Sequence, residues 1–415
     1  MSGTTPAAAV PAPQAAAADG SRGPLEDLVV LDLSSFMAAP MAAMWLADFG
    51  AQVIKVEHPR GDMMRDWGSR RDGVPLFWKM VGRNKESITL DLHEDAARDV
   101  LRRLVEKADV VVENFRPGTL AEWGLAYEAL AEVNPRLIML SVSAFGQTGP
   151  YSHRRGFGTL AEAMSGYAYM TGEPDGPPTL PSFGLADGVT GLTGAFAVLA
   201  AVHEQRLSGR GQHIDLALYE GLMTVMGHQF VEYDQLGIVA ERLGSRLPFA
   251  APRNAYQAAD GGWLAMSSSS QSVFERACKA IGRPELIEDP RFLDNQARTQ
   301  NNDELDRIFA EWIGSKPRQE AIDVLNEAGA AAAPIYSIEE VFEDPHFRER
   351  GNVARVEDVE LGEIGMQNVV PSFSRTPGQL RHAGPRLGEH TDRVLNDMIG
   401  LSAEEIAELR EQGAV

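Results

Sequence analysis

The sequence predicts an α/β fold, in which a large domain is built on a parallel sheet and a smaller module follows. Short apolar runs rich in β-branched residues alternate with helix-length segments up to about residue 220. Such a βαβ succession forms a right-handed parallel sheet covered by helices on both faces. A second pattern, in 255–332, is a strand pair around a turn followed by helices. The length of 415 residues fits two or three domains.

Six runs predict strands, because each is apolar and too short for a helix. They are LVVLDL (28–33), QVIKVE (52–57), SITLDL (87–92), DVVVEN (109–114), LIMLSVSAF (137–145) and HIDLAL (213–218). The segments between them predict helices over 38–49, 94–108, 120–131, 159–170 and 188–204. Thr159 followed by Glu162 has the spacing of a capping box at the start of the fourth helix.

The domain boundaries are expected where this periodicity stops. The Ala/Pro-rich tail, 1–24, predicts disorder. The large domain is expected over 25–220 and is completed by 355–415, which ends in a charged helix at 403–412. Between these parts we expect a linker over 221–252, the small domain over 253–335 and a return linker over 336–354.

Charge and composition exclude several classes of protein. Thirty-eight basic and fifty-nine acidic residues give a net charge of −21, so we expect no nucleic-acid partner. The single cysteine, Cys278, rules out an intramolecular disulfide and fits a reducing compartment. The tail lacks the basic and apolar regions of a secretion signal, and no apolar run reaches the length of a membrane span, about 18 residues. We therefore expect a cytoplasmic protein with no membrane partner.

Common catalytic motifs are missing from the sequence. It contains no GK dipeptide for a Walker A loop, no GxSxG and no HExxH. Its nine histidines and one cysteine do not have metal-ligand spacing, so we expect no metal.

Ligands of a parallel sheet bind beyond the carboxyl ends of the strands. The segments expected there are 34–40, 58–62, 115–118 and 146–157. In ENFRPG (113–118), Phe115 suits stacking on an adenine ring, Asn114 suits hydrogen bonds to it and Arg116 suits a phosphate, although a polar loop explains the same residues. The stretch 55–85 holds eight basic side chains, which fit either a solvated charged face or a phosphate site.

Asp187 is the candidate nucleophile. It lies just before a predicted Gly/Ala-rich helix in FGLADGVTGLTGAFA, where it either caps the helix or attacks a substrate as a carboxylate. A helix N-terminus keeps a carboxylate ionised, and Gly184, Gly188 and Gly191 allow a substrate or a backbone to approach closely. The two roles are compatible in position, so the residues alone leave both open.

Six segments together resemble the class III coenzyme A transferases, the family of formyl-CoA transferase, carnitine CoA-transferase and α-methylacyl-CoA racemase. The resemblance runs from about Pro24 to about Leu395. In the family's order, the segments are VVLDLSSFMAAPMAAMWLADFGAQVIKVEHPRGD, ADVVVENFRPGTL, NPRLIMLSVSAFGQTGP, SGRGQHIDLALYEGL, EDPHFRERG and GPRLGEHTDRVL.

The resemblance implies transfer of CoA from an acyl-CoA to a free carboxylic acid, with Asp187 at the position of the family's catalytic aspartate. Its carboxylate attacks the thioester to give a mixed anhydride and CoA thiolate, and the returning thiolate gives an aspartyl-CoA thioester that the second acid attacks. The resemblance also implies a Rossmann-like large domain and an interlocked homodimer. It implies no permanently bound cofactor, because coenzyme A enters as part of the substrate.

The family's CoA contacts match a set of positions in the segments named above. They are Met37, Ala38, His58, Leu90, Asp91, Leu92, His93, Asn114, Phe115, Arg116, Arg155, Gly156, Phe157 and Gly158. Family members often carry Arg or Lys where this chain has His58 and Glu122, and the glycine-rich loop of formyl-CoA transferase is replaced by GSRLPFAAPRNAY (244–256).

Two alternative functions share this scaffold. One is an α-methylacyl-CoA racemase or epimerase, but the racemase histidine expected after Gly156 is Phe157 in this chain. The other is a non-catalytic CoA-binding paralogue. The aspartate at the catalytic position, Asp187, favours an enzyme over this alternative.

Overall fold

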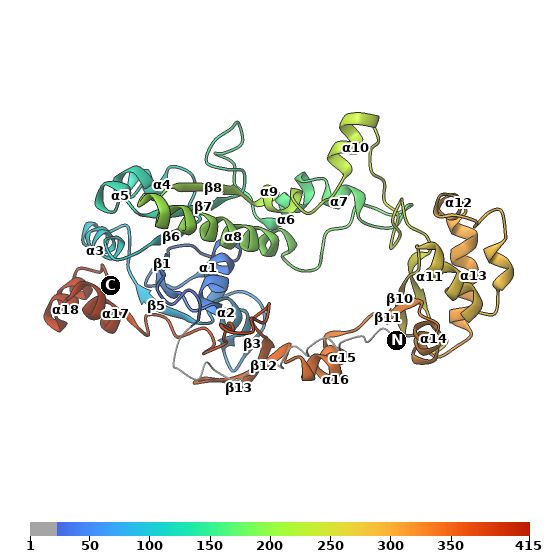
Figure 1. Ribbon diagram of the computed structural model, residues 1–415. Coiled ribbons are helices and arrows are strands. Elements are labelled where there is room, and N and C mark those ends of the chain that lie inside the picture. The colour runs from blue at the N-terminus through green and yellow to red at the C-terminus, as the bar shows by residue number, and fades with distance from the viewer. Residues whose placement is uncertain (1–22) are drawn as a thin grey trace, which may run out of the picture. The chain divides into compact units, whose positions relative to one another are not determined.

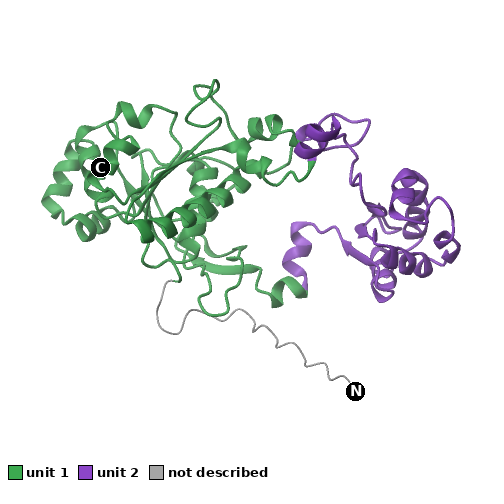
Figure 2. Ribbon diagram, turned by 45° about the horizontal axis from the view of Figure 1, so that its top comes forward, with its two compact units in different colours: residues 1–167, 180–228, 345–415 green, residues 168–179, 229–344 purple. Residues whose placement is uncertain are grey.

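The computed structural model describes residues 23–415, and the chain groups into two compact units (Figure 2). The first unit comprises the residues up to Tyr167, Leu180–His228 and Pro345–Val415, and the second comprises Ala168–Thr179 and Gln229–Asp344. The segment 168–179, which the sequence pattern places in the large domain, groups with the second unit. The tail predicted over 1–24 lies outside the described residues except for its last two.

A six-stranded parallel sheet forms the centre of the first unit, as predicted. Its strand order is β5-β2-β1-β6-β7-β8, and every neighbouring pair is parallel. The strands are β1 (Val29–Asp32), β2 (Gln52–Glu57), β5 (Lys85–Thr89), β6 (Val110–Glu113), β7 (Ile138–Ser143) and β8 (His213–Ala217). All six predicted strands are present. β5 begins two residues earlier than predicted, at Lys85, a charged residue that is nevertheless buried in the sheet.

Helices cover both faces of this sheet (Figure 1). Alternate strand residues point to opposite faces: Val30 and Val53 pack into one core, and Leu31 and Ile54 into the other. The first core is closed by α1 (Ala38–Asp48) and α8 (Leu185–Ser208). The second is closed by α3 (Asp95–Val105), α5 (Tyr127–Val133), α17 (Thr391–Ile399) and α18 (Ala403–Glu411). This is the arrangement that the βαβ pattern predicts.

Half of the basic side chains in the stretch 55–85 are buried, so they form neither a solvated face nor an open phosphate site. Four of its cations are buried in ion pairs with acidic residues: Lys55 with Asp62, Lys79 with Asp358 and Glu360, Arg83 with Asp48, and Lys85 with Asp32. A buried charge is tolerated when it is paired. Several of these acidic partners lie far away in the chain, so the local sequence does not reveal them.

The remaining elements of the first unit are short. They are the 3₁₀-helix η1 (Met63–Arg65), β3 (Arg70–Arg71), β4 (Val74–Pro75), α2 (Leu76–Val81), α4 (Thr119–Glu122), α6 (Gly158–Met164), α9 (Leu218–Met223), α16 (Pro345–Glu349), β12 (Val353–Asp358) and β13 (Gly362–Gln367).

The helix predicted over 159–170 is interrupted. It divides into α6 and α7 (Tyr167–Met170), with Gly166 at a φ of 95° between them. A left-handed glycine of this kind commonly ends a helix. The predicted capping box at Thr159 is wrong, because the N-cap is Phe157 and the carboxylate of Glu162 binds a different helix.

The second unit contains a three-stranded antiparallel sheet with the order β11-β10-β9. Its strands are β9 (Arg253–Gln257), β10 (Trp263–Ser267) and β11 (Ala331–Pro334), and β9 and β10 form the predicted strand pair. Its helices are most of α7, α10 (Gln229–Leu236), α11 (Gln271–Ala280), η2 (Pro284–Ile287), α12 (Asn295–Gln300), α13 (Asn302–Gly314), α14 (Arg318–Glu327) and α15 (Ile338–Glu343). α10 and α15 lie in the segments that the sequence pattern assigns to linkers.

Among the residues from 23 onward, α8 is the one helix that is long and apolar enough to cross a membrane by length and composition. Its residues Ala195, Val198 and Val202 are buried in the core that it shares with α1. Burial of one side against a sheet is typical of a helix in a protein core, so packing explains the apolar residues on the buried side of α8.

Candidate active site

Asp187 lies in the first turn of α8 and is not its N-cap. The helix begins at Leu185, and its N-cap is Gly184, which has no side chain to offer. The helix starts three residues earlier than the predicted residue 188, and Ala186 in its first turn is buried in the core. Asp187 therefore keeps the favourable electrostatics of a helix N-terminus, but its carboxylate is not used as the helix cap.

The carboxylate of Asp187 packs closely against α6. A Cβ placed on Gly158 would lie only 2.2 Å from Oδ2 of Asp187. The thioether of Met37 packs on Gly184 in the same way, since a Cβ there would lie 2.7 Å from its sulfur. Glycine at these two positions therefore leaves room for the carboxylate and for the loop after β1.

Aromatic rings lie in the loops that precede α6 and follow β1. The ring centroid of Phe36 is 4.9 Å from that of Trp67 and 5.8 Å from that of Phe157. The Phe157 side chain is 60% exposed. Phe157, where the resemblance predicts the racemase histidine, is thus an apolar side chain on the surface.

Burial and a neighbouring carboxylate raise the pKa of Asp187 to about 6. Burial is the larger cause, and the negative charge of Glu162 is the second. Among residues 23–415, no lysine, arginine or histidine forms an ion pair with Asp187. The group is therefore ionised at neutral pH but is less stable as an anion than an ordinary aspartate.

The nearby glycines of α8 have different surroundings. A Cβ on Gly188 would meet no atom within 4 Å, so this side of the helix is open. A Cβ on Gly191 would lie 2.8 Å from the ring of Trp45 and 2.9 Å from the carbonyl oxygen of Ala38. Gly191 therefore allows α1 to approach α8, and Ala38, a predicted CoA contact, is buried in that helix contact.

A cavity of about 360 Å³ opens at the carboxyl ends of β1, β2, β5 and β6, which is the edge where the topology predicts a ligand. Predicted CoA contacts that line it are His58, Leu90, Leu92, His93 and Phe115. Lys55, Arg60 and Trp123 also line it. The ring centroids of Phe115 and His93 lie 5.3 Å and 5.1 Å from that of Trp123, so the wall combines aromatic surface with hydrogen-bond donors.

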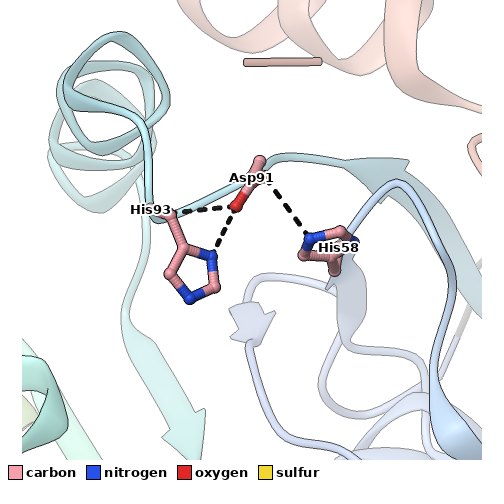
Figure 3. A group of neighbouring side chains, drawn as sticks. All are labelled: His58, Asp91 and His93. Carbon is pink, nitrogen blue, oxygen red and sulfur yellow. Dashed lines mark hydrogen bonds and ion pairs between the residues drawn. The ribbon is translucent and has the colours of Figure 1, made fainter. Parts of the chain in front are cut away.

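His58, Asp91 and His93 form a group beside this cavity (Figure 3). Oδ1 of Asp91 is 2.7 Å from Nδ1 of His93, and its Oδ2 is 3.4 Å from Nε2 of His58. The donor atoms of the three residues lie within 4.8 Å of one another, which is close enough for a metal. Nδ1 of His58, however, accepts a hydrogen bond from the Arg60 amide at 2.9 Å.

The proton of a neutral His58 therefore belongs on Nε2, facing Asp91. A metal at Nε2 would move this proton onto Nδ1, where a second N–H already points. The geometry favours a hydrogen-bonded group over a metal site. Burial acts to raise the pKa of Asp91, but the hydrogen bonds from the ring and the backbone amide of His93 lower it overall.

Asn114 is used by the protein itself. Its Oδ1 accepts from the amide of Ser35 at 2.8 Å, and its Nδ2 donates to the Ser35 carbonyl at 2.7 Å. Both ends of the side-chain amide are therefore occupied, which leaves little capacity for the adenine contact suggested by the sequence. Asn114 instead ties the loop after β6 to the loop after β1.

Several predicted contacts do not join these residues. Arg116 lines a separate cavity of about 140 Å³ together with Glu113 and His213. Burial, with a smaller effect of the Asp215 charge, raises the pKa of Glu113 to about 7. Arg155 is exposed, and a Cβ on Gly156 would lie 2.7 Å from the Cβ of Ala144, so Gly156 is a packing position.

Sequence reasoning missed the group that holds the loop after β1. Oδ1 of Asp62 accepts from the amide of Phe36 at 3.0 Å, and the ammonium group of Lys55 binds both Asp62 and the Ser34 carbonyl. Phe36 has a φ of 72°, which is uncommon for a residue other than glycine. The available signal was a lysine inside the buried run QVIKVE, since a buried cation needs an acidic partner.

Comparisons with known proteins agree with this fold. The profile of CoA-transferase family III matches residues 25–391. A succinyl-CoA–D-citramalate CoA-transferase of Chloroflexus aurantiacus is 44% identical over 389 residues, which cover 93% of this chain and 97% of that protein. The beta subunit of a succinyl-CoA–L-malate CoA-transferase from the same organism is 41% identical, with coverage of 94% and 98%.

Solved structures give the same assignment. The crystal structure of a CaiB/BaiF family protein from Brucella suis has a TM-score of 0.82 and 34% sequence identity, with coverage of 91% of this chain and all of that one. The match of the family profile over most of the chain and these relatives together show that this protein is a CoA-transferase and belongs to CoA-transferase family III.

Proposed function

We propose that this enzyme transfers CoA from succinyl-CoA to a short hydroxy-dicarboxylic acid, with Asp187 as the nucleophile. One observation carries the role of Asp187: its carboxylate is half-buried in the first turn of α8, faces the bare Cα of Gly158 and has no basic partner within the described chain. The substrate class is supported by the relatives named for succinyl-CoA with citramalate or malate.

In the proposed reaction, an oxygen of Asp187 attacks the thioester carbonyl and the C–S bond breaks. This gives a mixed anhydride and CoA thiolate. The thiolate attacks the aspartyl carbonyl, which releases the first acid and leaves an aspartyl-CoA thioester. The second acid attacks this thioester, and the freed thiolate then attacks the new acyl carbonyl, regenerating the Asp187 carboxylate. Each step conserves the energy of the thioester, so no external energy source is needed.

The cavity of about 360 Å³ is the proposed site of the CoA nucleotide. Phe115 and Trp123 offer aromatic surface for the adenine ring. His93 and Arg60 offer donors for the phosphate groups. His58 stands where other family members often carry Arg or Lys, and because its Nε2 proton faces Asp91 we propose that it forms part of the cavity wall. Leu90 and Leu92 supply apolar wall, and Asp91 orients both histidines.

The remaining predicted contacts form a second proposed group along the path to Asp187. Met37, Phe157 and Gly158 are proposed to border the acyl group. Asn114 and Ala38 are proposed to act as scaffold for the two loops that bound the cavity. Arg116, Arg155 and Gly156 do not line this cavity, and they stay predicted CoA contacts.

The surface of α8 supports the predicted homodimer. Leu192, Phe196 and Leu199 recur at helical spacing on its exposed side, and Phe196 is 73% exposed. Leu160 and Met164 of α6 are also exposed. A run of large apolar side chains on a helix is typical of a protein interface, and we propose that a second copy of this chain covers it. We also propose a cytoplasmic location, which suits the single, buried Cys278.

The test uses Asp187→Asn and Asp187→Ala, with Glu204→Gln near the far end of α8 as the matched control. Both Asp187 variants should lose transfer while still binding CoA, because no other group replaces the nucleophile. Borohydride added to wild-type enzyme with succinyl-CoA should reduce the aspartyl thioester and label Asp187 in a peptide map. Wild-type rates in either Asp187 variant would disprove the mechanism.

Substrate identity needs a separate measurement. Mass spectrometry of CoA thioesters formed from succinyl-CoA and a panel of free acids should find the hydroxy-dicarboxylic acids to be the best acceptors. Monocarboxylic acids of equal length are the matched control. Efficient transfer to monocarboxylic acids alone would contradict the proposed substrate class but would leave the role of Asp187 standing.

A further inference from the structure

We propose that Glu162 is a positioning residue for Asp187, which fixes the first turn of α8 and places a second negative charge beside the nucleophile. Glu162 forms no bond to substrate in this proposal. The inference rests on the proposed role of Asp187 and adds a residue that neither the sequence motifs nor the comparisons assign.

The first observation is a hydrogen bond between helices. Glu162 lies on α6 and is only 3% exposed, and its Oε1 accepts from the backbone amide of Ala186 at 3.1 Å. The first amides of a helix have no partner within the helix. Because the N-cap Gly184 has no side chain, Glu162 supplies from outside the acceptor that an N-cap residue would provide. The turn that it binds is the one that carries Asp187.

The second observation is the face of α6 on which Glu162 lies. Gly158 and Glu162 are four residues apart, so both lie on the same side of the helix. Gly158 is the residue that packs against Oδ2 of Asp187. The two carboxylates thus lie near the same end of α8, and the charge of Glu162 contributes to the raised pKa of Asp187.

The third observation is the absence of a compensating charge. Most other buried carboxylates of the first unit pair with cations, as Asp32 does with Lys85 and Asp48 with Arg83, and Glu113 is an exception. Within residues 23–415, neither Glu162 nor Asp187 forms an ion pair. Two carboxylates that share a partly dry site repel each other, which costs folding free energy. An arrangement that is unfavourable for stability is typical of a functional site.

The repulsion acts on one state of the enzyme. It disfavours the free carboxylate of Asp187, and it disappears when Asp187 becomes an anhydride or a thioester, because both are uncharged at the aspartyl carbonyl. Glu162 therefore shifts the internal equilibrium toward the covalent intermediates, and it makes the carboxylate more basic and a better nucleophile.

Glu162→Gln separates the two parts of this role. The glutamine carbonyl keeps the acceptor for the Ala186 amide and removes the charge, whereas Glu162→Ala removes both. Glu204→Gln, which deletes a charge from the exposed end of the same helix, is the matched control. Each variant is compared by melting temperature, by titration of the Asp187 carboxyl group and by transfer kinetics.

The titration is measured by ¹³C NMR of aspartate-labelled enzyme, with Asp187→Asn used to assign the signal. Glu162→Gln should lower the pKa of Asp187 from about 6 toward its ordinary value, while its melting temperature stays near that of the wild type. It should also lower kcat with little change in KM, by at most about tenfold for each unit by which the pKa of Asp187 falls. Glu204→Gln should change none of these quantities.

An Asp187 titration that is unchanged in Glu162→Gln overturns the inference, whatever the kinetics. A purely structural role predicts another pattern, in which Glu162→Gln behaves as wild type and only Glu162→Ala loses stability and activity. The titration does not depend on turnover. If Asp187→Asn retained transfer activity, the proposed function would fail on that result alone, and the NMR comparison would still decide whether Glu162 acts on Asp187.

Discussion

Replacing Gly158 by alanine should disable the nucleophile without unfolding the enzyme. The added Cβ would lie 2.2 Å from Oδ2 of Asp187, about 1.2 Å inside the 3.4 Å at which ordinary contact begins. The carboxylate must therefore move by about an ångström. A displacement of that size at a reacting group can reduce the rate about a hundredfold, so we expect a loss of this order in kcat for Gly158→Ala.

The fold should tolerate this change. Gly158 is the first residue of α6 and has no left-handed φ, and alanine is the better helix former by up to about 1 kcal/mol. The melting temperature should therefore stay near that of the wild type. Gly314→Ala is the control, because it places the same methyl group in α13 at an ordinary 3.8 Å from the nearest atom, the carbonyl oxygen of Gln257.

The assay is the initial rate of CoA-thioester exchange, followed by chromatography, together with a thermal melt of each variant. The reasoning predicts a large loss of rate in Gly158→Ala and none in Gly314→Ala. Full activity in Gly158→Ala would refute the claim that the position of the Asp187 carboxylate against α6 matters for transfer. A large fall in melting temperature would instead show that α6 cannot absorb the methyl group.

The other predictions concern pH, stability, assembly and stereochemistry. Transfer should rise about tenfold per pH unit below about pH 6 and level off above it, because the raised pKa of Asp187 keeps the nucleophile protonated at lower pH; a flat profile from pH 5 to 7 would contradict this. Arg83→Ala should lower the free energy of unfolding by about 3–5 kcal/mol, since it leaves buried Asp48 unpaired, and denaturant titration measures the loss. Phe196→Glu should dissociate the proposed dimer, which light scattering would register as a fall to the 45.1 kDa monomer mass. In D₂O with a 2-methylacyl-CoA and no acceptor acid, the α-carbon should gain no deuterium, because Phe157 cannot carry a proton; exchange at the rate of turnover would favour a racemase.

The parallel sheet could be predicted because each strand carries a local signal. The run LIMLSVSAF and the other apolar runs are short and β-branched, and both faces of the sheet are covered as such runs require. Element ends were less predictable. β5 begins at Lys85, whose charge argues locally against a buried strand, and only the ion pair with Asp32 across the sheet makes its burial tolerable.

The place of the cavity could be predicted, because the topology of the sheet determines it. Contacts between side chains and backbone groups far apart in the sequence could not be predicted. The carboxyl ends of the strands were identified from the fold class, and His58, His93 and Phe115 do line a cavity there. The role of Glu162 was not visible, because a glutamate three residues after Thr159 has the spacing of a capping box in its own helix. Its actual partner, the Ala186 amide, lies 24 residues along the chain.

The first turn of α8 is arranged to weaken its own carboxylate. A helix N-terminus stabilises a nearby anion by about 0.3–1 kcal/mol, which would lower the pKa of Asp187. The pKa instead rises from 3.8 to about 6, a net cost to the anion of about 3 kcal/mol. Burial and the charge of Glu162 therefore outweigh the helix terminus. Buried Asp48, by contrast, is paired with the cation Arg83. The unpaired and destabilised carboxylate is what covalent catalysis needs: it is still ionised at neutral pH, and it loses its unfavourable charge when it attacks.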